Sequence, residues 1–142
     1  MNPHAVSTTE RNKAQATKFF LEAFNKGNMA VVDETIAVTY KFNGQTQTRQ
    51  QVKEWVTGMR TTFQNLRFSI QAILAEGNMV ALRWQLTGTH TGGPNPTGNQ
   101  VTASGTNIIT FDPYGFGIDN MQNGQCSVKG TTVFDASEIY HN

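Results

Sequence analysis

His90 is the residue of this sequence best suited to acid–base chemistry. The other two histidines, His4 and His141, stand near the chain ends, where order is least expected. On strand parity His90 shares a face with Trp84 and Leu86, so it should point toward whatever those residues line. An imidazole titrates near neutrality and could act as an acid, a base or an oxyanion donor. The alternative is a histidine at a strand end that bonds to backbone or water.

The carboxylates are few, and each fits a place outside a cavity. We expect helix-surface charges at Glu22, Asp33, Glu34 and Glu54. Turn or loop positions are expected for Glu76, Asp112 and Asp119. Asp135 is expected to be the N-cap of a helix over residues 136–140. Asn107 lies in a predicted central strand, where its amide could contact a ligand carbonyl or belong to a polar network of the core. An amide forms hydrogen bonds but takes no proton.

Composition predicts one neutral domain spanning residues 1–142. Eleven basic residues against ten acidic ones leave no excess charge for binding nucleic acid. The single cysteine, Cys126, excludes an internal disulfide framework and is expected to be a small buried hydrophobic residue. The scattered histidines and cysteine have no metal-ligand spacing, and no nucleotide-binding loop is present, so we expect neither metal nor cofactor. With no long apolar run and no leader-like start, a cytoplasmic protein without membrane contact is expected.

Apolar spacing predicts helices in the first half of the chain. Residues 8–27 have apolar side chains at three- and four-residue intervals, with Ser7 or Thr9 as the cap and Gly27 as the stop. A short helix over 29–36 follows. Beyond a strand over 38–42 and the turn pair Asn43-Gly44, a third helix has one apolar stripe formed by Val52, Trp55, Val56, Met59 and Phe63.

Strand patterns dominate the second half, over residues 66–75, 79–91, 101–111 and 126–133. Helices followed by strands favour an α+β fold, with N-terminal helices packed on a strongly curved, mostly antiparallel mixed sheet that forms a cone with an apolar cavity. Six large side chains either line that cavity or form plain core: Phe24, Tyr40, Trp55, Met59, Trp84 and Phe111.

Six short phrases stand in an order typical of one family. They are Phe24-Asn25-Lys26-Gly27-Asn28, Phe63-Gln64-Asn65-Leu66-Arg67, Ala81-Leu82-Arg83-Trp84, Gly88-Thr89-His90-Thr91-Gly92, Pro96-Thr97-Gly98 and Phe134-Asp135-Ala136. From Asn12 to about Tyr140 the chain resembles the SnoaL-like polyketide cyclases, a branch of the cystatin-like α+β cone superfamily that includes ketosteroid isomerase. This fold serves many functions.

The resemblance implies an intramolecular aldol condensation without metal or cofactor, with an acid/base carboxylate on the final strand. Counted from Phe134-Asp135-Ala136, that position is Thr132, or Thr131 after a one-residue shift, and neither is a carboxylate. Threonine can orient or donate a hydrogen bond but is no general base near neutrality. The first strand, 38–42, likewise offers no carboxylate for ketosteroid-isomerase chemistry.

Residues 113–124 are expected to form a long loop, which is a second departure from the family pattern because relatives usually turn there in two to four residues. Their apolar side chains indicate either a dimer contact or extended hairpin, or a pocket lid.

We therefore expect a homodimeric protein that binds a hydrophobic polycyclic or polyketide-like small molecule. As an enzyme it would be a cofactor-independent cyclase or isomerase, with His90 as acid/base and with Thr132 and Asn107 orienting oxygens. The alternatives are a non-catalytic ligand-binding or dimerisation module, and a hydratase or hydrolase that positions water with Asn107 and Thr132.

Overall fold

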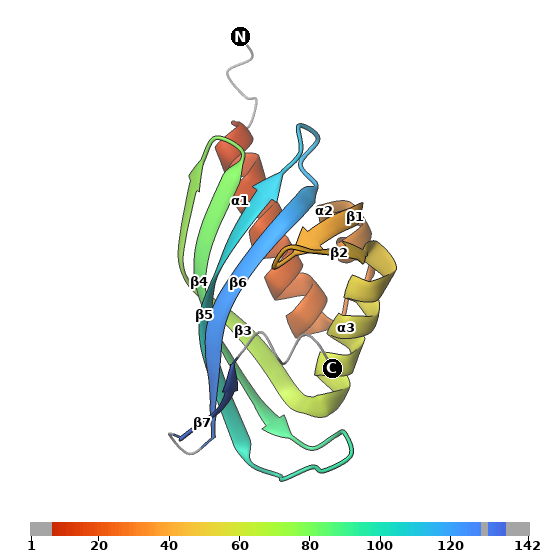
Figure 1. Cartoon of the computed structure of the whole chain (residues 1–142), viewed down its shortest axis with the longest axis vertical. Coiled ribbons are helices and arrows are strands. Elements are labelled where there is room, and N and C mark those ends of the chain that lie inside the picture. The colour runs from red at the N-terminus through yellow and green to blue at the C-terminus, as the bar shows by residue number, and fades with distance from the viewer. Residues whose placement is uncertain (1–6, 129–130, 136–142) are drawn as a thin grey trace.

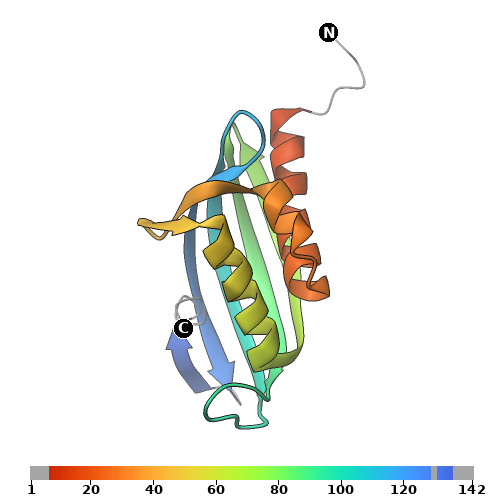
Figure 2. The same cartoon turned by 90° about the vertical axis from the view of Figure 1, so that its right-hand side faces the viewer.

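Helices cover one face of a long sheet in the computed structural model, which describes residues 7–128 and 131–135, with side chains for 7–124 (Figures 1 and 2). The helical segments are α1 (Thr8–Lys18), the π-helical η1 (Phe19–Phe24), α2 (Ala30–Thr35) and α3 (Arg49–Thr62). The strands are β1 (Ile36–Phe42), β2 (Gln45–Thr48), β3 (Phe63–Glu76), β4 (Met79–His90), β5 (Gln100–Phe111), β6 (Gly117–Val128) and β7 (Thr131–Asp135).

The described strands form one mixed sheet in the order β2-β1-β6-β5-β4-β3, with β7 also paired to β6. Strand β1 runs parallel to β6, and all other neighbours are antiparallel. Three long strands, β4, β5 and β6, thus form the centre of the sheet. The predicted α+β class, with helices on a curved and mostly antiparallel mixed sheet, is confirmed.

Local signals account for the helix boundaries. The Ser7 side chain accepts a hydrogen bond from the Glu10 backbone N–H, so Ser7 is the N-cap of α1. Helix α3 begins with a reciprocal capping box between Thr48 and Gln51. Along α3 the buried residues are Val52, Val56 and Met59, and burying each side chain stabilises the fold by about 1.5–3 kcal/mol.

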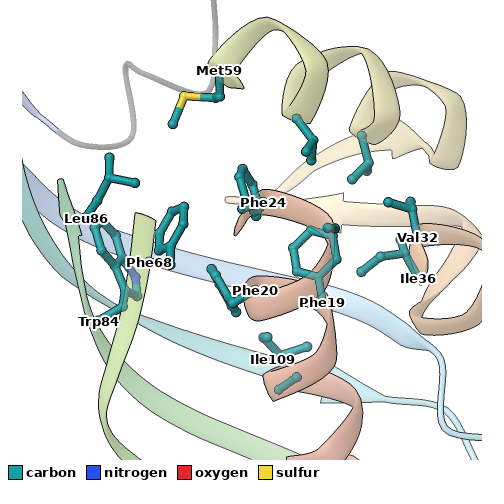
Figure 3. Close-up of a cluster of buried hydrophobic side chains, with 14 of the residues drawn as sticks. Phe19, Phe20, Phe24, Val32, Ile36, Met59, Phe68, Trp84, Leu86 and Ile109 are labelled. Carbon is teal, nitrogen blue, oxygen red and sulfur yellow. The ribbon is translucent and has the colours of Figure 1, made fainter. Parts of the chain in front are cut away.

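Aromatic side chains fill the space between η1 and the sheet (Figure 3). Phe24 and Phe20 pack on Phe68 of β3 at centroid distances of 4.7 Å and 5.2 Å, and Phe68 meets Trp84 edge-on at 5.3 Å. Just after η1, the Asn25 side chain bonds both backbone groups of Phe68, at 2.9 Å and 2.6 Å. Asn25 therefore ties the end of the first helical segment to β3.

The predicted loop over 113–124 is wrong, because most of it is strand β6. The chain turns within Asp112–Phe116, where Asp112 Oδ1 accepts the backbone N–H groups of Tyr114 and Phe116. Strand β6 then pairs with β5 along its whole length. Of the alternatives considered for this segment, the structure shows the extended hairpin and gives no lid. Asp119, expected in a turn or loop, is a β6 residue.

The predicted last strand over 126–133 is also corrected, since β6 continues to Val128 and β7 begins at Thr131. The side chains of Cys126, Thr131 and Thr132 lie outside the described part of the structure. So does the helix expected at 136–140. Asp135, expected to cap that helix, is the last residue of β7.

Exposed apolar side chains form a row across the outer face of the sheet. Leu74, Ala81, Ile108 and Met121 are paired in register across β3, β4, β5 and β6, and Leu74 is 73% exposed. Homodimerisation stays a prediction. Among the described helices, none has the length and apolar character needed to cross a bilayer.

Candidate ligand-binding site

Three buried amides lie on the helix-facing side of the central strands. Asn107 of β5 is fully buried, and Asn120 and Gln122 of β6 are 6% and 8% exposed. Asn107 pairs in register with Gln122 on one side and with Leu82 of β4 on the other. Since inward and outward residues alternate along a strand, Asn120 and Gln122 share the inward face of β6. The sheet therefore places a polar cluster inside an otherwise apolar core.

Hydrogen bonds connect these amides in series. The Trp84 indole Nε1 donates to Asn107 Oδ1 at 2.5 Å, and Asn107 Nδ2 donates to Asn120 Oδ1 at 2.7 Å and to Gln122 Oε1 at 3.3 Å. The oxygens of both β6 amides thus face Asn107. Their NH₂ groups point away from it.

The NH₂ groups of Asn120 and Gln122, which point away from Asn107, have no acceptor among the described residues. Gln122 Nε2 is buried without a hydrogen-bond partner, and the bonds of Asn120 involve its Oδ1 and its backbone. A buried donor left without a partner costs about 1–3 kcal/mol. Such a group in a native fold calls for an explanation, and a bound ligand is one.

A narrow pocket borders this cluster at Asn120. It lies between α1, α2 and strands β1, β5 and β6, and its empty volume is about 300 Å³ including the mouth. Its narrow part has room for about one water molecule. The walls include Phe19, Ile36, Ile109 and Phe111, and polar groups come from Gln15, Thr35, Tyr40, Asp119 and Asn120.

Tyr40 contributes a phenol hydroxyl group to this pocket. The residue is 5% exposed, and burial raises the pKa of its phenol well above the ordinary value of 10.0. The raised pKa keeps the side chain protonated throughout the physiological range, so its neutral O–H group can donate a hydrogen bond there. No described residue bonds its hydroxyl. Tyr40 and Asn120 thus bring two hydrogen-bond donors to one pocket.

No described carboxylate is hydrogen-bonded to the Tyr40 hydroxyl or to the Asn120 NH₂ group. Asp33 pairs with Lys53 and Arg49, and Glu34 with Lys18, at the surface. Asp119 lies in the pocket wall, but its register partners are the outward-facing Thr110 and the exposed Lys41, which gives it the outward parity. Within residues 7–128 and 131–135, no group of three or more His, Cys, Asp or Glu side chains could hold a metal ion.

The three residues predicted to act together are not brought together. His90 Nδ1 lies 3.2 Å from Thr97 Oγ1, and its ring packs against Phe63. Along β4, His90 is eight residues from Leu82, which is the register partner of Asn107. At the usual strand rise of about 3.3 Å per residue, this separation is about 26 Å. The Thr132 backbone pairs with Ser127 near the same end of the sheet as His90.

The six predicted ligand-lining residues divide between the pocket and the core. Tyr40 and Phe111 line the pocket. Phe24, Met59 and Trp84 are at most 3% exposed within the packed core (Figure 3). Trp55, which is partly buried, contacts the rings of Phe24 and Phe42. Their role toward a ligand stays a prediction.

Sequence reasoning did not single out Asn120 and Gln122. Both lie in the segment interpreted as a loop, because its inward positions are amides and not the apolar residues that normally indicate a strand. A period of two was present, since Asn120, Gln122 and Gly124 are buried while Met121 and Asn123 are exposed. The sequence does not display this alternation, because the buried and the exposed positions of β6 both include polar residues. Only the pairing of β6 with β5 shows which residues are buried.

Helices over one face of a curved mixed sheet, with a polar cluster on its inner surface, define a cone-type α+β domain. The model of the SnoaL-like polyketide cyclase family matches residues 14–114, and the chain belongs to that family.

Solved structures share the fold over most of their length. One is a candidate polyketide cyclase from Acidithiobacillus ferrooxidans, 28% identical, with a TM-score of 0.71 over 84% of this chain and 91% of that one. A candidate SnoaL-like cyclase from Jannaschia sp. CCS1 is 20% identical, with a TM-score of 0.73 over 87% and 91%. IdmH from Streptomyces antibioticus, a candidate polyketide cyclase, is 20% identical, with a TM-score of 0.69 over 80% and 91%. No curated protein matches the chain.

Proposed function

We propose that this protein binds a hydrophobic, polyketide-like molecule through a carbonyl oxygen and polarises that carbonyl for cofactor-independent cyclisation or isomerisation. The observation that carries the proposal is that Tyr40 and Asn120 both line one mostly apolar pocket, while no described residue accepts a hydrogen bond from the Tyr40 hydroxyl or from Asn120 Nδ2. Small-molecule sites combine apolar walls with a few placed polar groups in this way. Membership of a cyclase family supports the same class of ligand.

The proposed chemistry is enolisation. A C–H bond next to the carbonyl breaks, its proton passes to solvent water, and its electron pair moves through the carbon framework to the carbonyl oxygen. Hydrogen bonds from Tyr40 and Asn120 stabilise the charge that develops on that oxygen. The enolate carbon then attacks a second carbonyl of the same molecule, which closes a ring, or takes a proton at another position, which isomerises it.

The size of the pocket limits what it holds. Its narrow part has room for about one water-sized group, so only the carbonyl end of a polyketide-like ligand would enter it and the body would extend through the mouth. His90 has no part in this proposal, because its Nδ1 faces Thr97 at the far end of β4.

Proton exchange on a simple ketone tests the proposal. Acetophenone in D₂O should lose its methyl protons faster with the protein than without it, as followed by proton NMR. Asn120→Leu, which removes one pocket donor, should reduce the catalysed rate by about tenfold or more. Thr106→Ala, at an exposed position on β5, is the matched control and should keep the wild-type rate. A wild-type rate equal to the buffer rate would rule out the catalytic proposal.

A non-catalytic binding module is the second candidate. The observation that favours it is the make-up of the buried cluster, in which Asn107, Asn120 and Gln122 are amides and none is a carboxylate. Amides hold a carbonyl but remove no proton. Saturable binding of acetophenone without catalysed exchange would support this candidate over the enzyme.

A further inference from the structure

The hydrogen-bond series through the buried amides has one direction, and Trp84 sets it. An indole N–H donates and does not accept. Asn107 must therefore turn its oxygen toward Trp84 Nε1 and its NH₂ group toward β6. Asn120 and Gln122 must in turn present their oxygens to Asn107. The free ends of the series are NH₂ groups.

We propose that Trp84 determines the ligand specificity of the pocket by fixing it as a site for hydrogen-bond acceptors. Trp84 is a positioning residue, because it acts through Asn107 on Asn120 and is absent from the pocket wall. The ligand class is then an uncharged or anionic oxygen acceptor, because a group that can only donate leaves the Asn120 NH₂ group without a partner. This inference rests on the proposed binding of a carbonyl oxygen, and it adds the residue that selects it.

The reversed arrangement is unfavourable at every step. Rotating the Asn107 amide would bring its NH₂ group against the Trp84 N–H, and rotating Asn120 alone would bring two NH₂ groups together. Both leave buried donors facing one another without an acceptor, which costs a hydrogen bond and adds repulsion. The direction is thus a property of the chain of contacts and not of Asn120 itself.

Packing prevents Trp84 from leaving its position. The side chain is fully buried and meets Phe68 edge-on. On its other side it lies against Gly105, its register partner on β5, where a β-carbon would come within 2.6 Å of the ring. The indole therefore stays where its N–H meets Asn107.

Two probes of similar size read the polarity of the pocket. Acetophenone is an acceptor without a polar hydrogen, and indole donates one hydrogen bond through its N–H. Dissociation constants are measured by NMR titration of the ¹⁵N-labelled full-length chain. In the wild type we expect acetophenone to bind about tenfold tighter than indole or more, because indole offers no acceptor to the Asn120 NH₂ group and leaves that donor without a partner.

Three variants separate the polarity from the packing. Trp84→Phe removes the donor, so Asn107 and Asn120 can rotate and the preference should fall to about threefold or less. At a pH where its carboxyl is ionised, Asn107→Asp replaces the central amide by an acceptor, which turns the Asn120 NH₂ group inward and its oxygen toward the pocket, so indole should become the preferred probe. Val56→Ala, at a buried position of α3, loosens the same core without replacing a member of the series and should keep the preference for acetophenone.

The outcomes are distinguishable. If Trp84→Phe and Asn107→Asp both fold and both keep the wild-type preference for acetophenone, the inference is overturned. The proposed function is not affected by that result. Wild-type protein that binds neither probe, or binds indole tighter, overturns both. If Trp84→Phe does not fold, the result for Asn107→Asp decides alone, because that variant retains the shape of the side chain.

Discussion

Replacing Asn107 with leucine should lower the free energy of unfolding by about 3–5 kcal/mol. Asn107 is the partner of Trp84 Nε1, Asn120 Oδ1 and Gln122 Oε1. Leucine has a similar size but bonds none of them, and each buried group left without a partner costs about 1–3 kcal/mol. Urea unfolding at equilibrium measures the loss as a lower midpoint with an unchanged slope.

Asn107→Asp is the informative companion of this variant, because it retains the acceptor for Trp84 and offers acceptors to both β6 amides. We expect it to be clearly more stable than Asn107→Leu. A loss below about 1 kcal/mol for Asn107→Leu, the size of one ordinary hydrogen bond, would contradict the connected cluster described above.

Replacing Gly105 with alanine should cost about 3 kcal/mol and disrupt the hydrogen bond between Trp84 and Asn107. A β-carbon at this position would lie 2.5 Å from the Asn123 carbonyl oxygen, 2.6 Å from Trp84 Cζ2 and 2.9 Å from Gly124 Cα. Two of these atoms are backbone of the paired strand and cannot move without breaking the ladder. Overpacking of a core typically costs about 1–3 kcal/mol, occasionally more. Thermal unfolding and the NMR signal of the Trp84 indole N–H report the two effects.

Gly58→Ala provides the matched control for this change. Gly58 lies within α3, and a β-carbon there meets nothing within 4 Å. Alanine should therefore stabilise the protein, by up to about 1 kcal/mol, because it is the better helix former. If both variants changed stability in the same direction, the steric account of Gly105 would be wrong.

The sequence was sufficient to predict the elements whose buried side is apolar. Helix α3 was expected from the stripe that begins at Val52, and strands β4 and β5 from alternation through Val80, Leu82 and Val101. All three exist nearly as expected. In each case the hydrophobic effect acts on a periodic pattern that local sequence displays directly.

Strand β6 could not be predicted from hydrophobic alternation, because its buried side chains are polar. Its inward positions are Asn120, Gln122 and Gly124, which local patterns interpret as loop. They are buried because β5 supplies Asn107 as their partner, a contact between strands that no window of sequence contains. The candidate site was missed for the same reason, whereas Asn107 itself was found from its place in an apolar strand.

His90 illustrates a different limit. Parity placed it correctly on the face of Trp84, but parity does not report distance along a strand. The structure shows Trp84 in the core and His90 at the strand end, beside Thr97. His90 and Trp84 therefore lie on the same face of β4 but do not belong to the same site.

The central claim is that Asn120 presents its NH₂ group to a carbonyl oxygen in the pocket. Its most direct test is the side-chain amide signal of Asn120 in a ¹⁵N-correlated NMR spectrum during titration with acetophenone, assigned through Asn120→Leu. The account predicts a saturable shift of this signal, while the His90 and Thr97 backbone signals stay in place. Saturable shifts confined to the region around His90 and Thr97, with the Asn120 signal unmoved, would contradict it.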